Sequence, residues 1–143
     1  MTAGPTPLAL HHVGYVVPDI AAAAPSFALS LGASWDGCVY ADPHQKVKVT
    51  FLATRPGDAQ IELIEPAGED SPVLGFLREK GGGLHHVCYE VPDLEDALAA
   101  MKSRGALLAR PPKPAVAFRG RRIAWVLTRE KLLIEFLEAR SIQ

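Results

Sequence analysis

The chain has 143 residues, of which 48% are hydrophobic and 22% are charged, and its formal net charge is −1. This composition is typical of a folded globular protein and excludes an intrinsically disordered chain. The small net charge gives no electrostatic reason to expect nucleic acid or an anionic membrane as a partner. We therefore expect one domain over residues 1–143, with no nucleic-acid or membrane partner.

The expected cellular location follows from cysteine content and apolar segments. Cys38 and Cys88 are too few for a disulfide framework. The longest apolar stretches are strand-sized or interrupted by Pro, Asp or Gly, so we expect no transmembrane helix. The first residues lack a basic region followed by an apolar core, which a secretory signal would have. Together these features predict a cytoplasmic protein.

The first part of the chain predicts one strand, one helix and three further strands. A β-branched and aromatic run that alternates in polarity is followed by Pro18-Asp19, and Asp19 is well placed as a helix N-cap. The expected elements are residues 11–17, 20–31, 33–40, 47–53 and 59–65. A linker over 67–83 should contain a short helix that begins near Ser71.

The same pattern then returns. HHVGYVVPDI at 11–20 is matched by HHVCYEVPDL at 85–94, an offset of 74 residues (86 − 12). IELIE at 61–65 is matched by IEFLE at 134–138, an offset of 73 (134 − 61). A period this long indicates a duplicated supersecondary unit rather than a solenoid.

The second copy predicts the same order of elements as the first. The expected strand, helix and three strands are residues 85–91, 94–104, 106–108, 121–127 and 131–137. The stretch Pro111-Pro112-Lys113-Pro114 should be a stiff loop. The predicted order of elements in each half is therefore βαβββ, with the first module at about 8–66 and the second at 84–138.

Each copy carries histidines and a glutamate on strands, which are common ligands of divalent metals. Glu62 and Glu135 lie among Ile, Leu and Phe, where an inward carboxylate is costly unless it is paired or metal-bound. Two His and two carboxylates with open positions suit Zn, Co, Mn, Ni or Fe. The alternative is that these are core histidines and solvent-facing glutamates. This explanation would have to apply separately to each of the four residues, which stand at matched positions of the repeat.

Only one histidine of each pair is expected to face the interior. Side chains alternate between the two faces of a strand. We therefore expect His11 and His12 to point to opposite sides, and His85 and His86 likewise. One histidine per copy would then be available to a shared site.

A basic cluster lies where the two copies stop matching. It consists of Lys113, Arg119, Arg121 and Arg122. Arginine presents forked donors to phosphate oxygens, so the cluster is a candidate site for a bulky anionic substrate. The alternative is a solvated loop and strand edge.

The repeated motifs resemble the vicinal oxygen chelate superfamily (glyoxalase/bleomycin resistance/dioxygenase), and most closely its methylmalonyl-CoA epimerase family. HHVG at 11–14 followed by VPD at 17–19 is similar to that family's opening. IELIEPAGEDSP at 61–72 and GGGLHH at 81–86 are similar to its middle, and Ile134-Glu135 to its closing strand. The resemblance extends from about residue 10 to residue 138.

This resemblance implies a glyoxalase-like α+β fold, in which two tandem βαβββ modules form a curved mixed sheet around a metal-binding cleft. The implied ligands of a divalent metal are His12, Glu62, His86 and Glu135. The implied reaction is epimerisation of an acyl thioester, linked to CoA or a carrier, through removal of the α-proton. Methylmalonyl-CoA is the leading substrate, Glu135 is the best-placed acid/base residue, and a homodimer is the form that the family often takes.

Departures from the family pattern fall where substrate should be recognised. Some epimerases carry a second catalytic glutamate on the third strand, where Val49 aligns in this chain. Ala117-Phe118-Arg119 stands where the family has Gly-Ala-His. Two other functions are therefore weighed: a glyoxalase-type lyase or isomerase, and a metal-free protein of the same fold that binds small molecules such as drugs.

Overall fold

The computed structural model describes residues 8–140, which form one eight-stranded sheet with three α-helices and a short 3-10 helix, η1. The first half contains β1 (Ala9–Val16), α1 (Ile20–Leu31), β2 (Tyr40–Asp42), β3 (Val47–Leu52) and β4 (Gln60–Pro66). The helix α2 (Leu74–Lys80) follows. The second half contains β5 (Gly83–Val91), α3 (Leu94–Ser103), β6 (Leu107–Pro114), η1 (Val116–Phe118), β7 (Arg122–Leu127) and β8 (Leu133–Glu138).

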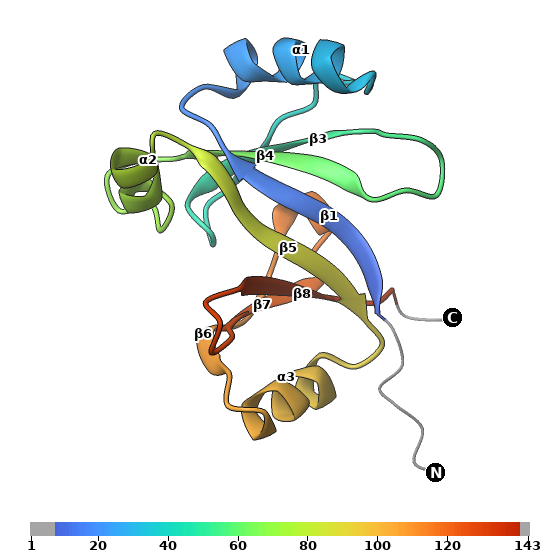
Figure 1. Cartoon of the computed structure of the whole chain (residues 1–143), viewed down its shortest axis with the longest axis vertical. Coiled ribbons are helices and arrows are strands. Elements are labelled where there is room, and N and C mark those ends of the chain that lie inside the picture. Colours follow the sequence, from blue (N-terminus) through green and yellow to red (C-terminus); the bar gives the residue numbers. More distant parts are fainter. Residues whose placement is uncertain (1–7, 141–143) are drawn as a thin grey trace.

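The sheet is mixed, and its strand order is β2-β3-β4-β1-β5-β8-β7-β6. β1 and β5 pair antiparallel at the centre and join the two halves, while β4 runs parallel to β1 and β8 runs parallel to β5. The sheet curls, and α1 and α3 lie on either side of the central pair of strands (Figure 1). The predicted α+β fold with a curved mixed sheet is confirmed.

The helices begin and end where local chemistry dictates. The side chain of Asp19 accepts a hydrogen bond from the backbone N–H of Ala21 at 3.0 Å, and α1 ends at Gly32 with a φ of 62°. Asp93 caps α3 by accepting from the N–H of Asp96 at 2.9 Å. Their apolar faces pack on the sheet, and no helix within residues 8–140 is long and apolar enough to cross a membrane.

The predicted strand at 33–40 is wrong. Within residues 33–39 only Ser34 makes a β-bridge, to Ala53. The carboxylate of Asp36 accepts from the N–H of Cys38 at 2.9 Å, and Gly37 has a φ of 81°. This turn interrupts extended pairing, so the second strand starts only at residue 40.

The predicted loop at 111–114 is also wrong, because these residues belong to β6. β6 is the last strand of the sheet and pairs only with β7. Proline is tolerated on an edge strand, where one side of the backbone needs no hydrogen-bond donor. The pairing shifts register on both sides of Arg110, which accommodates the imino acids.

Candidate metal centre and its cavity

Each histidine pair lies at a β-bulge in the central strands. In β1, Leu10 is opposite Tyr89 and His12 is opposite Cys88, so His11 is an extra residue. A bulge re-aims side chains and interrupts the strict alternation between faces. The expectation that His11 and His12 point to opposite sides is therefore wrong, since their Nδ1 atoms lie 2.8 Å apart.

The second copy repeats this arrangement. In β5, His86 is opposite Gly14 and Leu84 is opposite Tyr15, which makes His85 the extra residue. The Nδ1 atoms of His85 and His86 lie 2.9 Å apart. We call His12 and His86 the inner histidines and His11 and His85 the outer ones. Each inner histidine uses Nδ1 to contact its outer neighbour and directs Nε2 toward the centre of the sheet.

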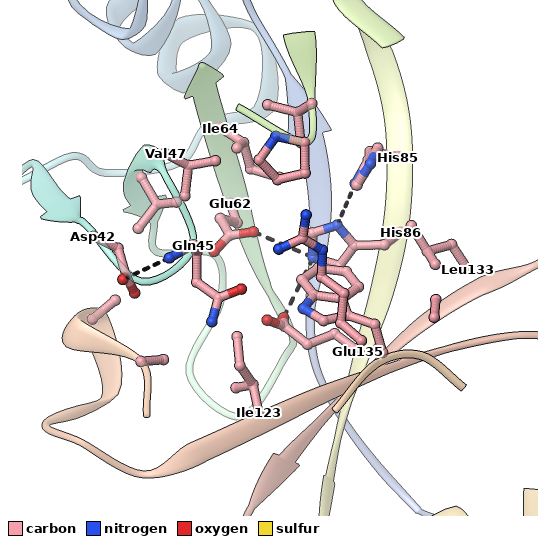
Figure 2. A pocket seen from close by; sticks show the side chains of 18 of the residues that line it. Asp42, Gln45, Val47, Glu62, Ile64, His85, His86, Ile123, Leu133 and Glu135 are labelled. Atoms are coloured by element: carbon pink, nitrogen blue, oxygen red, sulfur yellow. Dashed lines mark hydrogen bonds and ion pairs between the residues drawn. The ribbon is translucent and has the colours of Figure 1, made fainter. Parts of the chain in front are cut away.

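The structure brings together the four side chains that the sequence singled out. They come from the four central strands: His12 from β1, Glu62 from β4, His86 from β5 and Glu135 from β8. Dashed lines in Figure 2 mark contacts within this cluster, which is buried. The Nε2 atoms of the two histidines are 3.2 Å apart.

The spacing of these atoms fits a bound metal ion. The Oε1 atom of Glu62 lies 3.4 Å from Nε2 of His12 and 3.3 Å from Nε2 of His86. For Oε1 of Glu135 the corresponding distances are 3.0 and 3.4 Å. Ligand atoms bound to one ion at about 2.1 Å are separated by roughly 3.0–3.4 Å in octahedral or tetrahedral geometry.

The charges of the cluster fit a divalent cation as well. Burial opposes the charge of His12 and lowers its pKa, but Glu62, Cys88 and Glu135 more than compensate and hold the pKa well above 6.5. Burial likewise raises the pKa of Glu135, but His12 and His86 bring it far below its ordinary value. Oε1 of Glu135 is buried without a hydrogen-bond partner in the described part of the chain. A divalent cation would neutralise the two carboxylates and occupy this acceptor.

The outer histidines differ from the inner ones in charge. Burial lowers the pKa of His85 to about 4, with a further contribution from His86. Burial and His12 also lower the pKa of His11. Neutral outer rings can accept the Nδ1 proton of the inner rings, so that a metal ion which displaces the Nε2 proton would meet a lone pair directed at the cluster.

A cavity of about 200 Å³ opens onto the cluster and includes Glu62, His86 and Glu135 in its wall. Much of the remaining wall is apolar, and Figure 2 shows Val47, Ile64 and Ile123 around it. Val49 is buried in the same wall, so the position where some epimerases carry a glutamate is apolar here. The polar side chains of the wall include Gln45, His85 and Arg110.

The predicted basic cluster is divided between different surroundings. Arg119 and Arg121 line a second cavity, of about 600 Å³, whose described wall contains none of the four cluster residues. Arg122 forms ion pairs of 2.8 Å with Glu95 and with Glu138, and Lys113 is exposed on β6. The sequence reasoning missed Arg110, because the prolines that follow it hide the pairing of β6 with β7.

A curled mixed sheet built from two βαβββ halves is the glyoxalase-like α+β fold. The sequence model of the glyoxalase/bleomycin resistance protein/dioxygenase superfamily matches residues 11–125. The chain belongs to this superfamily.

Several of the proteins that are similar to this chain are epimerases. The chain is 38% identical over 118 residues to the ethylmalonyl-CoA/methylmalonyl-CoA epimerase of Cereibacter sphaeroides, covering 82% of this chain and 86% of the relative. It is 38% identical to human mitochondrial methylmalonyl-CoA epimerase over 96 residues, 66% of this chain and 53% of that protein. The crystal structure of methylmalonyl-CoA epimerase from Mycobacterium tuberculosis superposes with a TM-score of 0.84 at 25% identity, covering 98% and 94% of the two chains. These relatives place the chain among epimerase-like isomerases.

Proposed function

We propose that the chain is a metal-dependent epimerase of an acyl-CoA thioester, with methylmalonyl-CoA the leading substrate. The observation that carries the proposal is the buried His/Glu cluster, which opens onto a cavity of about 200 Å³. The names of the relatives supply the substrate class, because they act on methylmalonyl-CoA or ethylmalonyl-CoA.

The four residues of the cluster would hold the ion. When bound, a divalent ion supplies Lewis acidity that stabilises negative charge on a carbonyl oxygen beside the reacting carbon. The carboxylate of Glu135 lies in the cavity wall at the cluster, where it can take up the α-proton of a bound thioester. The apolar wall formed by Val47, Val49 and Ile123 excludes water from the carbon that loses this proton.

The cationic residues of the second cavity are proposed to bind phosphate groups of CoA. Arg119 and Arg121 share this cavity, and Arg121 is held in place by Glu90 at 3.1 Å. We expect Arg119→Ala to raise KM for a CoA thioester without lowering kcat. A thioester of N-acetylcysteamine, which lacks phosphates, should show no such difference; an equal effect on both thioesters would contradict the assignment.

The activity is tested by exchange of the α-proton. Methylmalonyl-CoA in D₂O with Co²⁺ or Mn²⁺ should gain deuterium at the α-carbon, followed by mass spectrometry. Glu135→Gln should slow the exchange by about 10²–10⁴-fold, the range for loss of an acid/base group. The matched control is Glu138→Gln on the same strand, because Glu138 instead pairs with Arg122. It should exchange within about 2-fold of the unchanged protein, as surface polar changes do.

The same samples separate the other two functions. If no exchange exceeds that of Glu135→Gln, the epimerase proposal fails. Turnover of a glutathione hemithioacetal would then support a glyoxalase-type enzyme. Purified protein that contains no divalent ion and shows no rise in Tm on adding one would support a metal-free binder.

A further inference from the structure

Arg110 and Trp125 stand side by side in the cavity wall. They are directly opposite one another on the antiparallel strands β6 and β7. Opposite residues of such a pair project from the same face of the sheet, and both line the cavity that contains the metal cluster. Trp125 also contacts His86, with ring centroids 4.6 Å apart. The pair therefore lies next to the proposed metal.

The indole of Trp125 has an unused hydrogen-bond donor. Its Nε1 is buried and has no acceptor within residues 8–140. Buried donors in proteins are nearly always paired. The other tryptophan, Trp35, follows this rule, because its Nε1 donates to Oγ1 of Thr50 at 2.7 Å. An acceptor for Trp125 is therefore expected from water or from a ligand in the cavity.

Arg110 provides a positive charge at the same place. It is the one Lys or Arg side chain in the described wall of this cavity, and residues 8–140 offer it no ion pair within 4.0 Å. The carboxylates of the wall are otherwise engaged: Glu62 and Glu135 face the histidines, and Asp42 accepts from backbone N–H groups. Arg110 and Trp125 together present donors to an anion.

This pair has no equivalent in the first half of the chain. At the 74-residue offset the corresponding residues are Asp36 (110 − 74) and Phe51 (125 − 74). Phe51 contacts His12 much as Trp125 contacts His86, with ring centroids 5.5 Å apart, but it has no N–H. The metal cluster is nearly symmetric, so it cannot distinguish the two ends of a chelating ligand. Arg110 and Trp125 can.

We propose that the guanidinium of Arg110 and the indole N–H of Trp125 bind the free carboxylate of the substrate and so fix the substrate's orientation at the metal. The substrate class rests on the proposed function, but the carboxylate site itself does not. A planar carboxylate can accept from both groups at once, whereas a thioester carbonyl carries no charge for Arg110 to recognise.

The first test observes the indole directly. The two tryptophans of the ¹⁵N-labelled, Zn²⁺-loaded protein give separate indole signals, which Trp125→Phe assigns. Malonate and methylmalonyl-CoA should shift the Trp125 signal downfield, and propionyl-CoA, which lacks the carboxylate, should not. The Trp35 signal should stay unchanged. Failure of saturating malonate to shift Trp125 overturns the proposal, whether or not the protein catalyses α-proton exchange.

The second test separates a carboxylate from the phosphates of CoA as the bound anion. Arg110→Gln should lower binding of methylmalonyl-CoA by at least about tenfold, the discrimination expected of a lost charged hydrogen bond. The N-acetylcysteamine thioester of methylmalonate should lose the same factor, and Arg110→Lys should restore part of it. Arg55→Gln, which removes an exposed arginine paired with Asp58, is the matched control. If the loss disappears with the truncated thioester, Arg110 binds phosphate and the proposal is wrong.

Discussion

The two halves of the chain agree at the centre of the sheet and differ at its outer strands. β1 and β4 repeat as β5 and β8, down to the bulge that places two histidines together. The outer strands of each half, β2 and β3 in the first and β6 and β7 in the second, form with their connections what we call the two arms. In the arms, Gln45, Val47 and Phe51 correspond to Arg119, Arg121 and Trp125 (119 − 45 = 74). The symmetric centre supplies the proposed metal ligands, and the asymmetric arms supply one apolar cavity at the cluster and one cationic cavity apart from it.

The axis that relates the halves is visible in contacts between equivalent residues. His12 and His86 touch through Nε2, and their numbers differ by 74. Asp42 and Val116 also differ by 74, and the carboxylate of Asp42 accepts from the N–H of Val116 at 3.0 Å. The first pair lies at the His/Glu cluster, and the second joins the two arms. Substitutions near the first contact test the part of the sheet that the two halves share, and substitutions at the second test the part in which they differ.

The largest effect is expected at Gly14, which faces His86 across the central strands. A Cβ at this position would overlap the His86 ring, which is buried. Gly14→Ala should therefore displace the ring and lower metal affinity by about 10–100-fold, as loss of ligand positioning does. Competition with a chromophoric chelator measures the change.

The matched substitution is at the equivalent position of the second half, Cys88 (88 − 14 = 74), which faces His12. The second half has a cysteine side chain where the first has glycine, so Cys88→Ala removes atoms whereas Gly14→Ala adds them. It should cost about 1 kcal/mol of stability through a small cavity and leave metal affinity close to that of the unchanged protein. Equal losses of metal affinity at both positions would show that the crowding of His86 is not the cause.

The next prediction concerns how stability depends on pH, and it compares the inner with the outer histidines. Burial lowers the pKa of both inner histidines, but Glu62 and Glu135 raise it above 6.5 at His12 and at His86, and Cys88 adds to the rise at His12. In metal-free protein this stabilisation is complete below pH 6.5, where folded and unfolded chains both carry the protons. It is lost as the pH rises through the raised pKa values, because only the folded chain still holds them.

Thermal unfolding from pH 6.5 to 9 measures this loss. With chelator present, Tm should fall as the pH rises; with bound Zn²⁺ the imidazoles are already unprotonated, and Tm should not fall in this way. The lowered pKa values of His11 and His85 act below pH 6.5 and in the opposite direction, so they do not enter this window. A metal-free Tm that stays constant or rises would contradict the expected charge state of the cluster.

Sequence alone predicted the centre of this molecule better than its edges. Duplicated motifs gave the central strands to within about two residues at each end and the meeting of the four cluster residues, because hydrophobic periodicity and repetition act there together. The bulges at His11 and His85 carry no compositional signal, since a one-residue register shift depends on the partner strand. Arg110 was missed for a similar reason: its role depends on a long-range pairing with Trp125.

The last prediction tests the link between the two arms. The buried carboxylate of Asp42 accepts from the backbone N–H groups of His44, Gln45 and Val116 at 2.9, 3.1 and 3.0 Å. Asp42→Ala leaves these donors without their acceptor, which should cost about 1–3 kcal/mol in urea unfolding. The matched control is Asp70→Ala, because Asp70 is exposed and pairs with Lys46.

Asp70→Ala should leave stability nearly unchanged, since exposed ion pairs contribute little. Hydrogen exchange at the N–H of Val116 then distinguishes a local from a shared role for Asp42. If the carboxylate joins the arms, Asp42→Ala should speed exchange at Val116 and not at Val126, which lies within β7 and is buried. If exchange at Val116 is unchanged, η1 is held instead by the packing of Phe118 against Phe51 of β3, whose ring centroids lie 5.7 Å apart.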